Sequence, residues 1–573
     1  MTETTHHGAR QLIVCCDGTN NTLTAGLNDT NVVKLTRMLA PAHQHQRLYY
    51  DPGVGVADTL PSVDRVQAIR RTWSRIEGLA SGRGVFENIG KAYRFLAEEY
   101  QEGDEIYLFG FSRGAFTARA VAGMVNLFGL IQPHNIDLLD MLVYTYFSRA
   151  GDVPPEAHKR TRREVADDIR DRFAGAGRDQ VDIHFLGVWD TVASVGMPGL
   201  RQKVTSDGLT STKRYRHVRH ALARNETRWT FLPRLFWEQD YDASHHPKGH
   251  SLKQRWFSGV HADIGGGYAF EHGADAAGLS DHALRWMVDE AVQCGLRLKA
   301  GEAPPSVSPQ IALMHCEPLS TPWWAIGGLV ERERALPPDE AKRMAAFVRD
   351  EQLLPYRTND DDLMKPQQYI EPWQAPRPWQ GLTRCLCAML CFYLLTALYA
   401  SAAMHGSLPA SWSEFSLDAL VAGGVQFDAW QRHLLTAPSS GAAAVMPAYA
   451  AWSIIFDFGL IGAYSWLLGF IAVRVFERVR HMAPGSHLRP PLLFMVGWLP
   501  CLTVVADLTE NLATLVTLAS QALLFPVLPW IAQAVMAIAN IVKWIALAGA
   551  VLGFGLGALT LSPPAADSEP SNA

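Results

Sequence analysis

Three residues far apart in the chain, a serine, an aspartate and a histidine, each follow an apolar segment and together could hydrolyse an ester. Ser112 lies in the pattern Gly110-x-Ser112-x-Gly114, after an apolar stretch and before a segment with helical spacing. This context predicts a nucleophile elbow, where the serine occupies a strained strand-to-helix turn and flanking glycines let the backbone pack closely. The N-terminus of the following helix would stabilise developing negative charge. We therefore predict that Ser112 is a nucleophile.

A serine hydroxyl needs a histidine to take its proton and an acid to hold that histidine in the useful tautomer. Asp190 ends the apolar segment 183–190 and is our candidate acid, although it could instead cap a following helix. His261 lies where a short apolar segment meets a glycine-rich turn, and it is our candidate base. Asp263 is an alternative acid or an orienting partner. The chain order serine, aspartate, histidine is that of α/β-hydrolases, not of chymotrypsin or subtilisin.

Acyl transfer also needs backbone N–H groups that stabilise the oxyanion. We expect one at Arg113, the residue after the nucleophile, and a second at Gly18 or Thr19 in the polar turn after the first apolar segment. An ordinary Asp-Gly turn would place the same residue types there, so both interpretations stay open. The turn at 50–55 could likewise supply an oxyanion donor or be an ordinary turn.

The elements that must position these residues alternate between strands and helices. Segments with helical spacing occur, for example, at 85–99 and 115–127. Short apolar segments that end in Asp, Gly, Ser or His predict buried parallel strands at 11–17, 47–51, 105–111, 181–190 and 256–260. The alternation predicts an α/β fold of the α/β-hydrolase type, doubly wound around a mostly parallel sheet.

Other parts of the N-terminal region do not follow this alternation. Segments 150–180 and 200–250 are expected to be excursions from the sheet, and we expect 200–250 to form a lid or cap. Segment 304–374 has many prolines and an acidic cluster, which favours a linker or a peripheral helical piece. We therefore place the catalytic domain at 1–360 and a linker at 361–381.

Charge is distributed unevenly along the 573 residues, because almost all charged side chains precede about Trp379. Segment 382–403 contains Arg384 as its only charge and is long enough to cross a hydrocarbon core of about 30 Å. Further long apolar segments lie at 452–476, 491–517 and 530–561. We predict a transmembrane helical region at 382–561 with about four spans, followed by a disordered tail at 562–573.

Arginines precede the first predicted span and lie between the second and third, whereas the loop 405–451 has only Arg432. By the positive-inside rule, the catalytic domain and the loop 477–490 face the cytoplasm. The sequence thus predicts a multi-pass protein of the inner, cytoplasmic membrane.

Three polar residues lie inside the third predicted span: Asp507, Glu510 and Asn511. Polar side chains are costly in hydrocarbon, so they indicate a buried polar site within the helices. Alternatively, the span ends near Ala506 and leaves them at the membrane interface.

Composition excludes several other functions. The formal net charge of −5 argues against a nucleic-acid partner, which needs a basic surface. The eight cysteines lack paired Cys-x-x-Cys spacing, so we expect free thiols and neither a metal nor a cofactor. Residues 1–10 are polar and contain no apolar h-region, so we expect no Sec-type signal peptide.

Four separated motifs carry a resemblance to a known family: 17–20, 110–115, 187–192 and 256–268. Over roughly residues 10–360 the chain resembles the uncharacterised α/β-hydrolase domain family that includes the phospholipase effectors of type VI secretion systems. This resemblance implies a Ser-Asp-His triad, acyl-ester hydrolysis and phospholipid substrates in membranes. The region after Trp379 departs from the family's usual appendage.

Three functions are therefore open. A resident membrane phospholipase or lipase would act on lipids of the inner leaflet. A secreted type VI lipase toxin would act on target-cell membranes and have secretion-spike or immunity proteins as partners. A membrane scaffold or receptor would bind a ligand in a hydrolase-like domain without turning it over.

Overall fold

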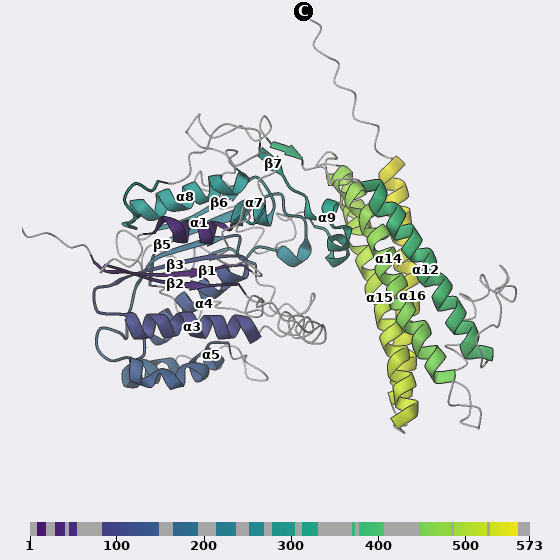
Figure 1. Cartoon of the computed structure of the whole chain (residues 1–573), viewed down its shortest axis with the longest axis horizontal. Helices are drawn as coiled ribbons and strands as arrows, with labels where there is room; N and C mark the ends of the chain where they lie inside the picture. Colours follow the sequence, from purple (N-terminus) through teal and green to yellow (C-terminus); the bar gives the residue numbers. More distant parts are fainter. Residues whose placement is uncertain are drawn as a thin grey trace, which may run out of the picture. The chain divides into compact units, whose positions relative to one another are not determined.

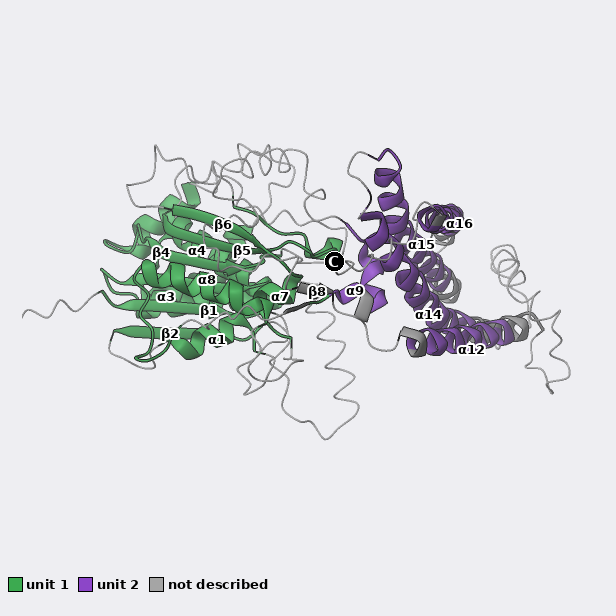
Figure 2. Ribbon diagram, turned by 90° about the horizontal axis from the view of Figure 1, so that it is seen from above, with its two compact units in different colours: residues 1–315, 332–373 green, residues 316–331, 374–573 purple. Residues whose placement is uncertain are grey.

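A computed structural model describes residues 9–18, 29–39, 45–53, 83–147, 164–192, 214–236, 251–268, 278–303, 312–330, 370–372, 378–405, 446–480, 482, 486–523 and 528–559. The chain divides into two compact units (Figure 2). The first comprises residues 1–315 and 332–373, and the second comprises residues 316–331 and 374–573.

The first unit is built on a six-stranded sheet in which all neighbouring strands are parallel. Its strands are β1 (Gln11–Cys16), β2 (Gln46–Asp51), β3 (Glu105–Phe111), β4 (Ile183–Trp189), β5 (Tyr215–Ala223) and β6 (Ser251–Phe257). They lie in the order β2-β1-β3-β4-β5-β6. The chain thus places β2 on one side of β1 and the following strands on the other, so the strand order reverses between β1 and β3. Ligand sites of open parallel sheets form at such a switch point, outside the carboxyl ends of the strands.

Helices cover both faces of this sheet (Figure 1). One face carries α3 (Arg83–Glu99), α4 (Arg113–Phe128) and α5 (Leu139–Phe147), and the other carries α1 (Asn31–Met38), α7 (His261–Gly265) and α8 (Leu279–Gln293). Alternate residues of β1 contribute to two separate cores, Leu12 and Val14 to one, Ile13 and Cys15 to the other. Both faces are buried, which explains the uninterrupted apolar run in the sequence. The α/β class with a parallel sheet is confirmed.

The expectation of a lid across 200–250 does not hold for Tyr215–Ala223, because this segment is strand β5 inside the sheet. Arg219 and His220 interrupt the apolar pattern of this segment, so the sequence does not indicate a buried strand there. Arg219 Nε donates to Glu290 at 2.6 Å, and His220 Nδ1 lies 3.1 Å from the Gln254 side-chain oxygen. Partners supplied by the fold let these polar residues occupy a buried strand. Residues 200–213 and 237–250 lie outside the described part of the chain.

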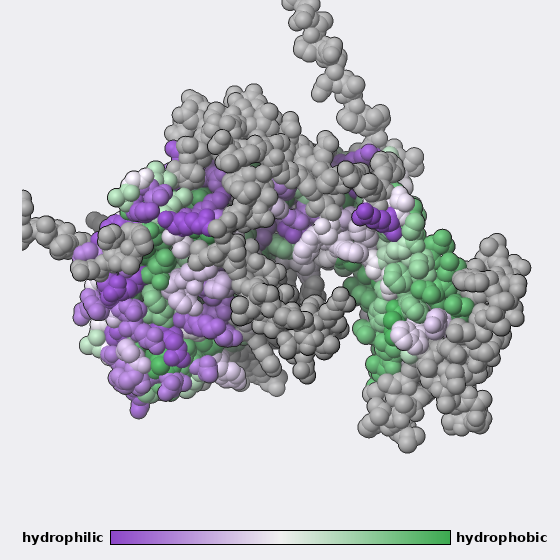
Figure 3. Space-filling model, in the orientation of Figure 1, coloured by the Kyte–Doolittle hydropathy of each residue, from purple (hydrophilic) through white to green (hydrophobic). Residues whose placement is uncertain are grey.

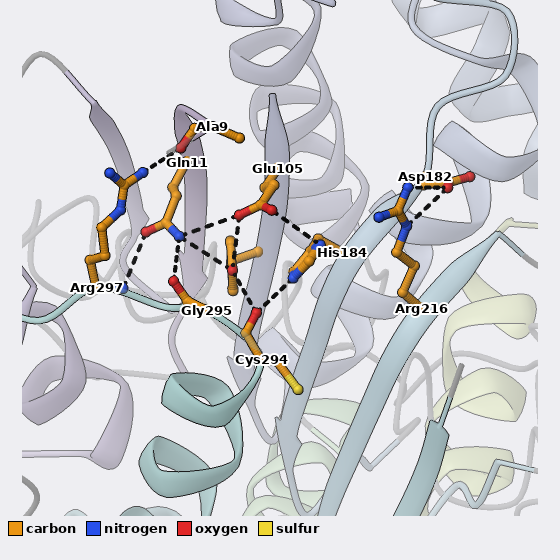
Figure 4. A network of polar contacts seen from close by, with 10 residues as sticks. Ala9, Gln11, Glu105, Asp182, His184, Arg216, Cys294, Gly295 and Arg297 are labelled. Carbon is orange, nitrogen blue, oxygen red and sulfur yellow. Dashed lines mark hydrogen bonds and ion pairs between the residues drawn. The ribbon is translucent and has the colours of Figure 1, made fainter. Parts of the chain in front are cut away.

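Polar side chains at the amino-terminal edge of the sheet hold the end of α8 (Figure 4). Gln11 Nε2 donates to the carbonyl of Gly295 at 2.8 Å. The Tyr107 hydroxyl donates to the carbonyl of Cys294 at 3.1 Å, and His184 Nε2 lies 2.7 Å from the same oxygen. Helix ends leave carbonyls without intrahelical donors, so these contacts satisfy them and fasten α8 to β1, β3 and β4. This edge therefore stabilises the fold, away from the edge that carries Ser112.

The second unit consists mainly of four long helices: α12 (Pro378–His405), α14 (Met446–Arg480), α15 (Arg489–Leu523) and α16 (Leu528–Leu559). Each contains a stretch that is long and apolar enough to cross a membrane, at 381–399, 451–480, 489–516 and 534–558. Large apolar side chains are exposed on them, including Leu390, Ile538 and Ile545. Figure 3 shows the hydrophobic surface of these helices and the more hydrophilic surface of the first unit.

Short elements accompany the two units. Strands β7 (Ala312–Met314) and β8 (Ile370–Pro372) form a small parallel pair in the first unit. Within the second unit, α9 (Glu317–Ser320) and η5 (Pro322–Gly327) precede Leu329, whose N–H donates to the Gly497 carbonyl in α15 at 3.0 Å. Segment 316–331 therefore packs with the apolar helices.

Helix α15 continues well past Ala506, so the three polar residues predicted inside it lie within the helix and not at its end. Lys543 from α16 places its Nζ atom 3.1 Å from Asp507 and 2.6 Å from Glu510. Asn511 donates to Asp457 of α14 at 2.7 Å. These contacts agree with a buried polar site among the helices, while the place where a membrane span would end stays a prediction.

Candidate active site

Ser112 occupies a sharp turn between β3 and α4. Its φ of 58° and ψ of −121° are unusual for a residue with a side chain, and they place strain at this position. A Cβ atom on Gly110 would lie 2.4 Å from the Gly114 carbonyl oxygen, and a Cβ on Gly114 would lie 2.2 Å from the Cys16 carbonyl oxygen. Only glycine fits at either position. The flanking glycines thus let α4 approach the ends of β3 and β1, as a nucleophile elbow requires.

The structure brings Ser112, His261 and Asp190 together at the carboxyl edge of the sheet. Ser112 Oγ lies 2.7 Å from His261 Nε2, and His261 Nδ1 lies 2.6 Å from Asp190 Oδ2. With its hydrogen on Nδ1, His261 donates to Asp190 and accepts from the serine hydroxyl. All three side chains are buried. This arrangement can transfer the serine proton to the imidazole while the carboxylate stabilises the imidazolium.

The backbone of β5 holds the Asp190 carboxylate. Asp190 Oδ1 accepts the N–H of Ala223 at 2.9 Å, and the Asp190 N–H donates to the Ala221 carbonyl at 2.7 Å. Asp190 also has a positive φ of 40°, which places its side chain in a strained turn after β4. Both carboxylate oxygens are thus bonded outside the segment that follows, which does not favour the helix-capping interpretation.

Asp263, the alternative acid, bonds elsewhere. Its Oδ1 lies 2.7 Å from His315 Nδ1, and its Oδ2 accepts the N–H groups of Val260 at 3.0 Å and His315 at 3.1 Å. Burial raises the pKa of Asp263, and the His315 hydrogen bond opposes that shift. Because Val260 directly precedes His261, Asp263 fastens the start of α7. These contacts favour the orienting role over the acid role.

A second group, not predicted from the sequence, also holds His261. Glu226 accepts the His261 backbone N–H at 3.2 Å, and Arg228 Nη2 donates to the same carboxylate at 2.7 Å. The rings of Phe111 and Phe231 lie 4.7 and 4.9 Å from the His261 ring, centroid to centroid. Glu226 and Arg228 lie in the segment that was expected to be a lid. The signal available in the sequence was an acidic and a basic residue two positions apart, shortly after the segment that forms β5.

Arg113 begins α4, and no acceptor for its backbone N–H occurs among the described residues. The N–H groups in the first turn of a helix lack intrahelical partners, so this one is available to an oxyanion beside Ser112. The N–H of Phe116 already donates to the Ser112 carbonyl at 3.3 Å.

The turn after β1 is held by Asp17. Its Oδ2 accepts from the hydroxyls of Thr30 at 2.9 Å and Tyr50 at 2.8 Å. Its Oδ1 accepts the N–H of Gly18 at 2.6 Å, so this candidate oxyanion donor is engaged in the present conformation. Thr19, the other candidate, lies outside the described residues.

Metal-ligating side chains do not gather in the described part of the chain. Within it, no three His, Cys, Asp or Glu side chains are close enough to hold a metal ion. The eight cysteines are all free thiols, and burial raises the pKa of Cys15 to about 12. Such a buried, protonated thiol is a poor nucleophile.

Comparison with known proteins identifies the domain that carries this site. Residues 10–290 match the family model described as T6SS, Phospholipase effector Tle1-like, catalytic domain. The chain is also 33% identical over 242 residues to Uncharacterized protein YEL023C of Saccharomyces cerevisiae (strain ATCC 204508 / S288c). The aligned residues make up 40% of this chain and 33% of the yeast protein. The chain thus spans about a third of the length of that curated relative. No solved structure matches the chain. Residues 10–290 therefore belong to the family of Tle1-like phospholipase effector catalytic domains, which confirms the resemblance drawn from the four motifs.

Proposed function

We propose that this protein is a serine hydrolase of acyl esters with an α/β-hydrolase fold, and that its substrates are membrane phospholipids. The observation that carries the proposal is the hydrogen-bonded series from Ser112 through His261 to Asp190. The strained elbow and the parallel sheet support it, because they place a nucleophile at the edge where open α/β sheets bind ligands. The family match supports a phospholipid as the ester.

The residues perform the reaction in two stages. Ser112 Oγ attacks the ester carbonyl carbon while His261 Nε2 takes the hydroxyl proton, and Asp190 stabilises the resulting imidazolium. The oxyanion accepts hydrogen bonds from the Arg113 N–H and from the turn after β1, at Gly18 or Thr19. Gly18 takes this role only if its N–H leaves Asp17. His261 then protonates the departing alcohol, and a water molecule hydrolyses the acyl-enzyme with the same base.

The test compares the full chain in detergent with its Ser112→Ala variant. Turnover of short p-nitrophenyl esters should fall by about 10⁴- to 10⁶-fold, because the nucleophile is lost. A fluorophosphonate probe should label Ser112 of the wild type and leave the variant unlabelled. An unchanged melting temperature of the variant shows that the fold is intact. Equal turnover by the two proteins would remove the proposal.

We propose further that the four apolar helices of the second unit span a membrane. Their exposed apolar side chains suit lipid tails, and the ionisable groups of α15 and α16 face one another instead of lipid. Arginines near Arg384 and at the facing ends of α14 and α15, namely Arg478, Arg480 and Arg489, favour a cytoplasmic catalytic domain in the inner membrane. The triad would then act on lipids of the inner leaflet.

The family match also favours a second role, that of a type VI secretion lipase toxin delivered to target-cell membranes. Secretion-spike and immunity proteins would be its partners. A third possibility, a scaffold or receptor that binds a ligand without turnover, would leave Ser112 unlabelled by the probe. A lipid-class screen of the wild type beside Ser112→Ala separates an active phospholipase from this scaffold.

A further inference from the structure

Among the described residues, Arg113 differs from the other arginines near the site because its guanidinium has no protein partner. Arg228 binds Glu226 at 2.7 Å, and Arg219 binds Glu290 at 2.6 Å. Arg119 donates to the Leu235 carbonyl at 3.2 Å and stacks on the Phe236 ring. Arg113 is partly buried, yet the described residues place no carboxylate, carbonyl or aromatic ring against its guanidinium.

This isolation has an energetic consequence. Removing a cation from water is costly unless an anion or hydrogen-bond acceptors replace the lost hydration. Burial lowers the pKa of Arg113 to about 10, with no acidic neighbour opposing the shift. The N-terminus of α4, a helix of 16 residues, adds positive potential at the same position. The guanidinium of Arg113 is therefore a cation that no acidic side chain among the described residues balances.

We propose that Arg113 binds the phosphodiester group of the glycerophospholipid whose acyl ester lies at Ser112. This inference rests on the proposed hydrolase function and adds the residue that selects the substrate. A guanidinium matches a phosphodiester with two parallel hydrogen bonds, whereas a neutral acylglycerol offers no anion. Arg113 is the first residue of α4 and directly follows Ser112, so an extended arginine side chain has the length to reach a phosphate in the same substrate molecule as the scissile ester. Arg113 thus favours phospholipids over acylglycerols.

The first test is stability, with Arg228 as the matched comparison. Arg113→Met removes a charge that the protein leaves unbalanced, so the melting temperature of the full chain in detergent should rise. Arg228→Met leaves Glu226 buried without its cation, so the melting temperature should fall. A fall for Arg113→Met as large as that for Arg228→Met would mean that Arg113 has a structural partner, and it would overturn the proposal.

The second test compares dihexanoyl phosphatidylcholine with dihexanoylglycerol, which have the same acyl esters. Arg113→Gln should lower kcat/KM for the phospholipid about 10- to 100-fold more than for the acylglycerol, the range expected for a charged hydrogen bond. Arg113→Lys keeps the charge without the bidentate geometry. Its kcat/KM for the phospholipid should therefore lie between the values of the wild type and Arg113→Gln. Glycerophosphocholine should inhibit the wild type and inhibit Arg113→Gln less.

The outcomes separate the two proposals. Equal losses on both substrates would overturn the role of Arg113 while leaving the hydrolase function in place. Inhibition of the wild type by inorganic phosphate without inhibition by glycerophosphocholine would indicate a free-anion site, which also overturns it. If the wild type hydrolysed neither substrate and Ser112 remained unlabelled by the fluorophosphonate, the hydrolase function itself would fail.

Discussion

Asp190 and His261 are joined by a 2.6 Å hydrogen bond, while the second oxygen of Asp190 accepts the backbone N–H of Ala223. The carboxylate is therefore held between strand β5 and the imidazole. Asp263, only two residues after His261, bonds instead to His315. The two aspartates thus have different tasks, one at the histidine ring and one at the backbone that carries it.

Asp190→Asn should lower kcat for p-nitrophenyl esters by about 10⁴-fold, because an amide no longer stabilises the imidazolium or its tautomer. Asp263→Asn is the matched control, since it changes a carboxylate that lies two residues from His261 in the sequence but contacts His315. Its loss should be far smaller. Steady-state kinetics of both variants decide the matter, and a larger loss for Asp263→Asn would reverse the assignment.

Gly114→Ala should destabilise the catalytic unit and abolish turnover, because the new Cβ would lie 2.2 Å from the Cys16 carbonyl oxygen. Gly90→Ala in α3 is the matched control, since the nearest atom to its Cβ would be 3.5 Å away. Alanine there should stabilise the protein by about 0.5–1 kcal/mol. Thermal unfolding of both variants checks the prediction, which fails if Gly114→Ala melts at or above the wild-type temperature.

Asp51, the buried last residue of β2, makes stability depend on pH. Burial raises its pKa to about 7, which Lys91 partly opposes. Between about pH 4 and pH 7 the unfolded chain has lost this proton while the folded chain keeps it, so the free energy of unfolding falls as pH rises. Asp51→Asn should remove this penalty, with a gain that is absent below about pH 4 and reaches about 2–4 kcal/mol above pH 7.

Unfolding measured at pH 4 and pH 8 tests this dependence on Asp51. Asp168→Asn, a substitution of an exposed aspartate, controls for the removal of a negative charge. A gain from Asp51→Asn that is the same at both pH values would contradict the expected dependence.

Lys543→Met should destabilise the helical unit, because Asp507 and Glu510 would lose the cation that lies 3.1 and 2.6 Å away. The loss should be about 3–5 kcal/mol, as for other buried pairs that lose one partner. Neutralising the acids as well, with Asp507→Asn and Glu510→Gln, should restore much of it. Circular dichroism during titration with sodium dodecyl sulfate measures both, and no difference between the single and triple variants would contradict the pairing.

The orientation of the helices follows from the distribution of arginines. A cysteine introduced in the loop 404–450 should react with a membrane-impermeant reagent from the periplasmic side, whereas His487→Cys should be protected. A reporter fused after Leu561 should be active in the cytoplasm if four spans are correct. Labelling of His487→Cys from outside, with protection of the 404–450 loop, would reverse the orientation.

The local sequence was enough to predict strands β1 to β4, the end of β6, the elbow and the apolar helices. The apolar run 11–17 and the spacing of Gly110, Ser112 and Gly114 depend on short-range constraints: burial on both faces of a strand, and close backbone packing around one turn. The candidates Ser112, Asp190 and His261 came from the same reasoning, since each follows a strand at the edge where parallel sheets place functional side chains.

Only the tertiary structure decided which groups meet. Strand β5 escaped prediction because Arg219 and His220 are paired with Glu290 and Gln254, residues distant in the sequence. Likewise, Asp263 contacts His315, and Glu510 contacts Lys543, through packing that no local pattern encodes. A charge in a sequence does not say whether water or a distant partner will surround it. That difference in solvation separates a surface residue from one that can orient a buried histidine such as His261.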